Sequence, residues 1–268
     1  MSSAIYVFGF VAKGTLPESL KIDGLEPGHC VIQRDSTGIT AVVSQVPLNY
    51  FVGEEAETRL NDIEWVAPRA LNHQRAIERI ISLSPVLPAQ FGVLFSSFEN
   101  LEKFVEGNHT AISEFLELTA DKNEWGVKAY WDKERAQERL MERDFAEHTR
   151  TVAQLSDGVR YFREKQLKAE IDRTAADQLK KVLVDGSTKL SDMAFDARKR
   201  KIINADSGED GYELVANWTF LFALDRLDEF LAVLNDFNEE NSVNGVYLQK
   251  SGPWPPYSFV PELIWEFN

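Results

Sequence analysis

The hydrophobic pattern of residues 1–132 predicts an α+β domain. Residues 4–11 (AIYVFGFV) are apolar on both faces, which is typical of a central strand covered on two sides. Further strands are predicted at 29–34, 39–46, 86–95 and 125–131, with helices at 69–84 and 99–118. This order of strands and helices favours an α+β sandwich with helices on one face of the sheet.

The pattern changes at Lys133, because no strand-like run is found from there to about Asp206. An apolar stripe at helical spacing, Leu167, Ile171, Ala175, Leu179 and Val182, is interrupted at residues 185–188. Gly186 is placed there as a helix stop and Ser187 as the next N-cap. The sequence therefore predicts a long antiparallel helical hairpin, whose first helix is about 40 Å long at ~1.5 Å per residue.

Strand and helix patterns return after residue 206, with strands at 213–224 and 245–250 around a helix at 226–239. The predicted domains are thus 1–132 and 133–268. The second is helical over 133–206 and α+β over 207–268, where it ends in a tail rich in proline and aromatic residues.

The net charge of −14 over 268 residues argues against a nucleic-acid partner, since phosphate binding depends on Lys and Arg. No apolar run approaches the ~20 residues of a membrane helix, and the N-terminus lacks the basic region of a signal peptide. The single cysteine, Cys30, excludes an intramolecular disulfide. A cytoplasmic protein without a membrane partner is therefore expected.

Residue types that carry chemistry are scattered. The histidines, His29, His73, His109 and His148, have no partners at metal-ligand spacing except the pair His29–Cys30, whose side chains would leave a strand on opposite faces. Glycine-rich phosphate loops and a nucleophile elbow are missing from the sequence. We therefore predict no catalytic residue, no cofactor and no metal site, and expect Cys30 to be a buried thiol and His73 a packed or surface side chain.

Two sets of charged residues can be interpreted either as functional sites or as ordinary features of helices. Asp225 and Asp228 could serve as an acid and a base, but a solvated helix start explains them better. The basic run at residues 198–201 could bind anions or an acidic partner. Its place near the end of a predicted helix favours cations that complement the helix dipole.

The tail at residues 252–261 (GPWPPYSFVP) contains four prolines and three aromatic residues. It is a rigid segment that either caps the core or presents an aromatic surface to a partner. Trp254, Tyr257 and Phe259 are the candidate partner-binding residues. Of these, Trp254 is expected in the core, whereas Tyr257 and Phe259 are the favoured contact residues because they lie nearer the chain end.

Seven motifs, in order along nearly the whole chain, resemble the gas vesicle protein L/F family (GvpL/GvpF). They are IYVFGF (5–10), LNHQRAIERI (71–80), VLPAQFGVLFSS (86–97), WGVKAYWD (125–132), GVRYFREK (158–165), NWTFLF (217–222) and GPWPPYSFV (252–260). The resemblance implies two modified ferredoxin-like α/β sandwiches, the second with a helical excursion. It carries over no catalytic residue. Many members have Arg where this chain has Gln90, so a role for a cation there is in doubt.

The resemblance also implies an accessory protein of gas vesicle assembly, located at the gas vesicle. Its partners would be the hydrophobic shell subunit (GvpA-type) and other accessory proteins. Our hypothesis is a non-enzymatic assembly factor, whose binding surface is a sheet edge, the hairpin or the tail. Two alternatives stay open at this point: a ferredoxin-like domain that binds a small ligand or acts as an enzyme, and a minor structural component of the shell.

Overall fold

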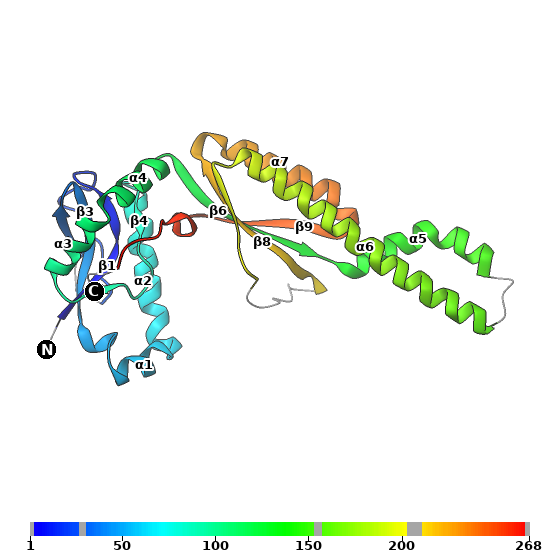
Figure 1. Cartoon of the computed structure of the whole chain (residues 1–268), viewed down its shortest axis with the longest axis horizontal. Coiled ribbons are helices and arrows are strands. Elements are labelled where there is room, and N and C mark those ends of the chain that lie inside the picture. Colours follow the sequence, from blue (N-terminus) through cyan, green and yellow to red (C-terminus); the bar gives the residue numbers. More distant parts are fainter. Residues whose placement is uncertain (1–2, 27–30, 153–156, 203–210, 266–268) are drawn as a thin grey trace. The chain divides into compact units, whose positions relative to one another are not determined.

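The computed structural model describes residues 3–26, 31–152, 157–202 and 211–265 (Figure 1). The chain forms two compact units. The first comprises Met1–Glu124 together with Pro253–Asn268, and the second comprises Trp125–Gly252. The expected domains, 1–132 and 133–268, differ from these units in two places: the boundary near residue 132 and the assignment of the C-terminal tail. Strand β6 (Lys122–Trp131) belongs to the sheet of the second unit, and the tail returns to the first.

The first unit is built on a sheet in the order β2-β3-β1-β4, with β5 also paired to β1. Its strands are β1 (Ser3–Ala12), β2 (Ile32–Ser36), β3 (Ile39–Pro47), β4 (Leu87–Pro88) and β5 (Leu94–Phe95). The strand β1 is central, as its apolar sequence predicts, and it pairs antiparallel with β3, β4 and β5. Thr37 and Gly38 close the β2–β3 hairpin with φ of 47° and 88°, as a two-residue turn requires.

Helices cover both faces of this sheet, not one as expected. Its helices are α1 (Glu54–Leu60), α2 (Ile63–Ile81), α3 (Phe98–Gly107) and α4 (His109–Thr119), with a 3-10 turn at Leu48–Tyr50. A register shift between Val7 and Gly9 places Phe8 against α2, whereas the Phe10 ring meets Phe104 of α3. Both faces of β1 are apolar, so each needs its own cover.

Two predicted elements of this unit are interrupted. The strand predicted at 86–95 is reduced to β4 and β5, because residues 90–92 turn away from β1 between the bonds that Ala89 and Val93 make to it. The helix predicted at 99–118 breaks at Asn108, which leaves the helical conformation with φ of −113° and ψ of 10°. The break at Asn108 contacts the C-terminal tail, and Ala89 and Val93 line a groove beside it, as described below.

The second unit contains a sheet in the order β7-β8-β6-β9. Its remaining elements are α5 (Lys133–Val152), α6 (Asp157–Met193), β7 (Asp196–Lys199), β8 (Glu213–Ala223), α7 (Leu227–Asn241) and β9 (Val246–Trp254), with 3-10 turns at Leu224–Arg226 and Ser242–Asn244. Alternate residues of β6 and β8, such as Trp125 and Phe220, join α6 and α7 in one core. The α+β class is confirmed for both units.

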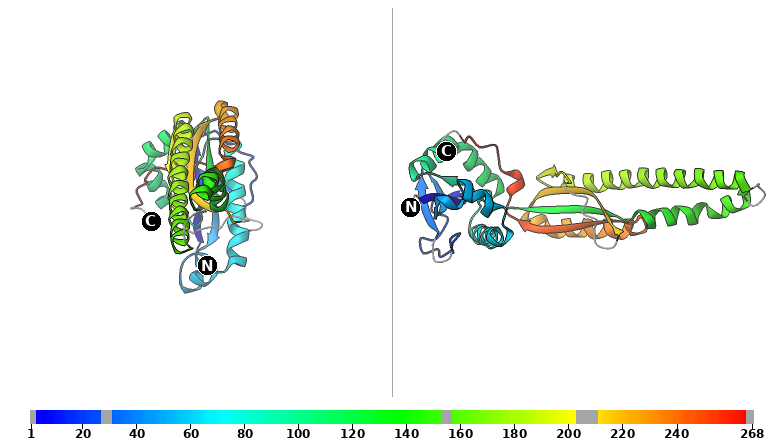
Figure 2. Two further views of the ribbon diagram at one scale, coloured as in Figure 1. Left: turned by 90° about the vertical axis from the view of Figure 1, so that its right-hand side faces the viewer. Right: turned by 90° about the horizontal axis from the view of Figure 1, so that it is seen from below.

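The helical hairpin is formed by α5 and α6, which run antiparallel side by side (Figure 2). The predicted break at residues 185–188 is wrong, because α6 continues through Gly186 to Met193. Gly186 is a site of close approach to α7: a Cβ placed there would lie 2.6 Å from the Phe237 ring. The glycine therefore serves helix packing, and a sequence pattern does not separate this role from a helix stop.

We expect Gly186→Leu to lower the free energy of unfolding by about 1–3 kcal/mol, since the new side chain must displace the buried Phe237 ring. Gly158→Ala is the matched control in the same helix, where an added Cβ meets nothing within 4 Å. It should be neutral or stabilise by up to about 1 kcal/mol. Urea titration of both variants measures this, and equal effects would contradict the packing role.

The basic run at residues 198–201 is also placed differently from the prediction. Arg198 and Lys199 lie on β7, an edge strand paired with Thr219 and Trp218 of β8, and not at a helix end. The Arg200 backbone nitrogen donates to the Asn217 carbonyl at 2.8 Å. Charged side chains on an edge strand discourage pairing with other chains, which is a sufficient reason for the run.

Candidate functional site

The C-terminal tail is fixed to the first unit by two pairs of hydrogen bonds. The carboxylate of Glu124, 4% exposed, accepts from the Ser258 backbone nitrogen at 2.8 Å and from the Ser258 hydroxyl at 2.7 Å. Asn108 donates to the Ile264 carbonyl at 3.0 Å and accepts from the Ile264 nitrogen at 2.7 Å. The break between α3 and α4 thus places an amide side chain where it pairs with extended backbone.

The three aromatic residues of the tail have different environments. Phe259 is 4% exposed, whereas Trp254 is 41% exposed. The expected assignment of Trp254 to the core and Phe259 to the surface is therefore reversed. The reason is chain direction: the 3-10 turn at Tyr257–Phe259, held by Glu124, directs Phe259 inward. Tyr257 is half-buried and packs against the core beside β1.

A buried cluster joins the tail to the sheet and to α2. The Tyr6 hydroxyl lies 2.8 Å from His73 Nδ1, and His73 Nε2 lies 3.1 Å from the Ala89 carbonyl oxygen. That carbonyl can only accept, so Nε2 carries the proton and Nδ1 accepts from Tyr6. The Tyr257 hydroxyl lies 3.5 Å from Nε2, and the Gly92 nitrogen donates to the Tyr6 hydroxyl at 3.4 Å. We call these five residues the Tyr–His cluster.

Burial decides the protonation of this cluster. Loss of solvent lowers the pKa of His73 to about 4, against a weaker opposing effect of its bond to Ala89. Burial also raises the pKa of Tyr6 and of Tyr257, and the charges of Glu78 and Glu124 add to the effect on Tyr257. His73 is thus a neutral, fully bonded imidazole, 4% exposed, that a solute does not reach. Its role is to hold the fold, as the expectation of a packed side chain allowed.

The cluster brings together four motifs on which the family resemblance rests. Tyr6 belongs to IYVFGF, His73 to LNHQRAIERI, Ala89 and Gly92 to VLPAQFGVLFSS, and Tyr257 to GPWPPYSFV. Sequence reasoning missed the cluster because its members are far apart along the chain; His73 and Tyr257 alone are separated by 184 positions. The available signal was the presence of two tyrosines and one histidine in the motifs that the sequence analysis singled out.

Beside the cluster, a groove of about 550 Å³ separates residues 87–93 from the C-terminal segment. We call it the tail groove. Its lining residues are Phe10, Leu87, Pro88, Ala89, Gln90, Val93, Tyr257, Val260, Pro261, Glu262, Leu263 and Trp265. Most of them are apolar. Gln90 contributes an uncharged amide to the wall, so the groove has no cation at this point.

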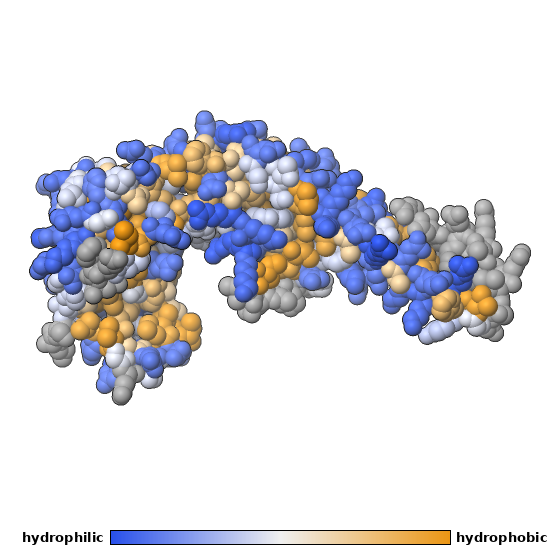
Figure 3. Space-filling model, viewed as in Figure 1, coloured by the Kyte–Doolittle hydropathy of each residue, from blue (hydrophilic) through white to orange (hydrophobic). Residues whose placement is uncertain are grey.

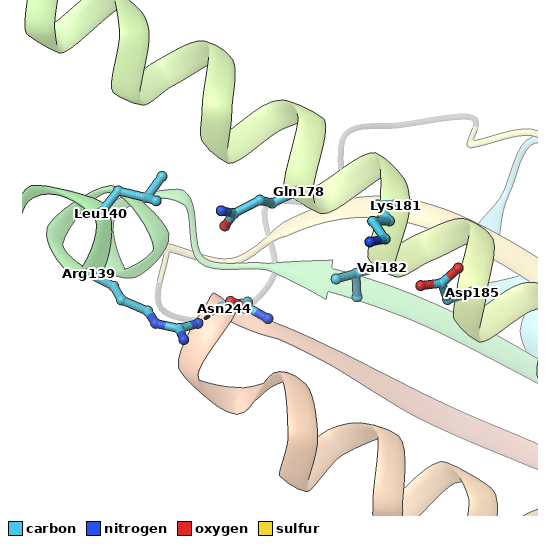
Figure 4. A pocket seen from close by; sticks show the side chains of 7 residues that line it. All are labelled: Arg139, Leu140, Gln178, Lys181, Val182, Asp185 and Asn244. Carbon is cyan, nitrogen blue, oxygen red and sulfur yellow. Dashed lines mark hydrogen bonds between the residues drawn. The ribbon is translucent and has the colours of Figure 1, made fainter. Parts of the chain in front are cut away.

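The second unit contains a more polar pocket, of about 440 Å³, between α5, α6 and the turn at Ser242–Asn244. Figure 4 shows the Arg139 side chain reaching toward Asn244, to which it donates a hydrogen bond. The other lining residues are Leu140, Gln178, Lys181, Val182 and Asp185. This set contains two cations, one carboxylate and two amides, and it lacks a nucleophile with a neighbouring base.

The described residues considered for chemistry lie on separate elements or at the exposed start of one helix. Asp225 and Asp228 are exposed around the start of α7, as a solvated helix start implies, and His109 begins α4. His29 and Cys30 lie outside the described residues, as does the side chain of His148. Within the described part of the chain, no three His, Cys, Asp or Glu side chains gather as metal ligands. No described helix is long and apolar enough to cross a membrane.

Three carboxylates have a lowered pKa, each for a local reason at the surface. Asp35 accepts from Thr40 and pairs with Lys13, Glu99 is bound by Lys103, and Asp121 by Lys122. They line neither the tail groove nor the polar pocket.

The sequence of this chain matches known proteins over almost its full length. It is 29% identical to gas vesicle protein L of Streptomyces sp., over 92% of this chain and 88% of that protein. It is 26% identical to gas vesicle protein L1 of Halobacterium salinarum, over 87% and 81% of the two chains. It is also 24% identical to gas vesicle protein F of Streptomyces sp., over 97% and 100%.

Solved structures show the same fold. The crystal structure of gas vesicle protein GvpF from Anabaena sp. superposes with a TM-score of 0.69 at 15% identity, over 97% of both chains. That of GvpF from Microcystis aeruginosa gives 0.65 at 15% identity, over 97% of this chain and 99% of the other. The model of the family described as gas vesicle synthesis protein GvpL/GvpF matches residues 4–261. The resemblance inferred from the motifs is thereby confirmed: the chain belongs to the GvpL/GvpF family and has a role in gas vesicle assembly.

Proposed function

We propose that this chain is a non-enzymatic accessory protein that holds the hydrophobic shell subunit of gas vesicles in the tail groove. The observation that carries the proposal is the groove itself. It is largely apolar, open to solvent, and formed on one side by the tail, which contributes Tyr257 and Leu263. An apolar groove with few polar groups suits an apolar protein segment better than a polar metabolite.

The charge of the chain supports the same function. A shell that keeps water out needs subunits with a strongly apolar face, and free subunits of this kind aggregate. A binding partner with a net charge of −14 keeps such a complex apart from its neighbours by repulsion. The groove would then cover part of the apolar face until the subunit is incorporated. Other accessory proteins are proposed as further partners.

Deletion of the gene is the first test. We expect cells without this protein to make no mature gas vesicles while they still express the shell subunit, because an unprotected subunit aggregates before assembly. Electron microscopy and an immunoblot for the shell subunit measure the two quantities. Normal vesicles in the deletion strain would contradict an assembly role.

The groove is tested by returning variants to that strain. Leu263→Glu places a charge in the groove, and Leu83→Glu is the matched control, since Leu83 is 38% exposed in the same unit but does not line the groove. We expect Leu263→Glu to weaken binding of the shell subunit by about thirtyfold or more, as for an interface hot spot, and to fail to restore vesicles. The control should behave as wild type.

Equal binding by both variants would remove the tail groove from the site and leave the assembly role in place. Washing isolated vesicles with denaturant then separates two forms of that role. A minor shell component stays with the washed vesicles, whereas a transient chaperone is lost from them.

A further inference from the structure

The beginning of α6 carries exposed aromatic and basic side chains. Tyr161 is 69% exposed, Phe162 60% and Val159 47%. Residues 158–168 contain four basic side chains against one acidic, Glu164, which gives a local charge of +3 in a chain of −14. We call residues 158–168 the α6 end, by which we mean the N-terminal end of this helix. Figure 3 shows hydrophobic surface at this place, next to strongly hydrophilic residues.

A second exposed apolar surface lies in the first unit, where α1 meets α2. Ile63 is 72% exposed, Val52 55% and Leu60 43%. We call Val52 and residues 55–64 the α1–α2 corner. Residues 55–64 contain four carboxylates against one cation, Arg59, which gives a local charge of −3. Figure 3 shows hydrophobic surface over α1 and the start of α2.

The α1–α2 corner is held in shape from beneath. The Trp65 ring packs against Phe51, with ring centroids 5.7 Å apart. Arg69 stacks on Trp65 at 4.0 Å and binds both carboxylate oxygens of Glu26, at 2.6 and 3.0 Å. A rigid surface loses little conformational entropy when a partner docks, so less of the binding free energy is lost in ordering these exposed apolar residues.

Because the two surfaces complement each other in charge and both expose apolar side chains, we propose that this protein associates with a second copy of itself. The α6 end of one copy docks on the α1–α2 corner of the next. Arg and Tyr are favoured at interface centres, and the carboxylates of the corner face the Arg and Lys side chains of the helix. The opposite local charges also select this orientation over others, since the rest of both chains repel each other.

The contact is heterologous, because it joins two different surfaces. Every copy keeps a free α6 end or a free α1–α2 corner after one contact has formed, so association continues beyond the dimer. This self-association goes beyond the proposed function and does not depend on the tail groove.

Charge reversal in the full-length chain tests the proposal. Arg163→Glu with Lys165→Glu reverses the α6 end, and Glu57→Lys with Glu64→Lys reverses the corner. Arg173→Glu with Lys180→Glu is the matched control, because both residues are exposed on α6 outside its end. Sedimentation velocity is measured from about 1 to 200 µM protein, at about 25 and 500 mM salt.

We expect the wild type and the control to sediment faster as concentration rises, and high salt to reduce the effect. Each reversed variant should associate at least about tenfold more weakly. A mixture of the two reversed variants should associate again, since the intact corner of one variant pairs with the intact α6 end of the other and their two reversed surfaces also have opposite charges. A chain with all four reversals should associate again, because its surfaces are once more complementary.

Circular dichroism and melting temperature verify that each variant is folded. A wild type that stays monomeric at low salt over the whole concentration range would overturn the proposal. So would a mixture of the two reversed variants that fails to form dimers, or a control that loses association to the same extent.

Discussion

Phe259→Ala is expected to lower the free energy of unfolding by about 3–5 kcal/mol, the usual cost of removing a buried phenylalanine ring. Its ring is 4% exposed and lies in a turn held by Glu124, so the surroundings cannot simply close the cavity. Trp254→Ala is the comparison within the same tail. Since Trp254 is 41% exposed, we expect a loss of no more than about 1 kcal/mol.

Urea or thermal unfolding of both variants measures the two losses. A larger loss for Trp254→Ala than for Phe259→Ala would contradict the burial described above. The roles of Trp254, Tyr257 and Phe259 in partner binding stay a prediction. If Phe259 acts through the core, Phe259→Leu should restore both stability and shell-subunit binding, whereas a direct contact would require the aromatic ring.

Lowering the pH should destabilise the first unit through His73. Its pKa is about 4 in the folded chain and 6.5 ordinarily, so between these values the unfolded chain binds a proton that the folded chain does not. Stability is therefore unaffected by this group above pH 6.5 and falls as the pH drops toward 4. At pH 4.5 the loss relative to pH 7 is about 2–3 kcal/mol.

His73→Gln isolates this contribution, because an amide does not titrate. The variant should be less stable than wild type at pH 7, where its hydrogen bonds to Tyr6 and Ala89 are disturbed. Its stability should fall less steeply between pH 6.5 and 4.5. Urea unfolding at several pH values measures both curves, and parallel curves would show that His73 is protonated as readily in the folded chain as in the unfolded one.

The two predictions concern the same assembly of segments. Tyr257 and the bonds of Ser258 to Glu124 attach the turn that contains Phe259 to the first unit, and His73 links Tyr257 through Ala89 and Tyr6 to the sheet. The tail groove exists only when this assembly is formed, since one of its walls is the tail itself. Destabilising it by low pH or by Phe259→Ala should therefore weaken shell-subunit binding as well.

The amino-acid sequence by itself determined the class of fold and most of its elements. Local periodicity is enough to place β1, β3, β6, β8 and α7, because the alternation of apolar residues within one element reports which of its faces are buried. The motifs in their order were enough for the family. Charge was enough to argue against a nucleic-acid partner.

Tertiary structure alone decided features that depend on contacts between distant segments. Gly186 has the sequence signature of a helix stop, but the approach of Phe237 explains it inside a continuous helix. The placement of Trp254 outside and Phe259 inside follows from Glu124, which lies 134 residues from Ser258. The Tyr–His cluster and the tail groove likewise form only when the chain end returns to the first unit. Periodicity describes the faces of one element, and it carries no information about which distant residue will cover them.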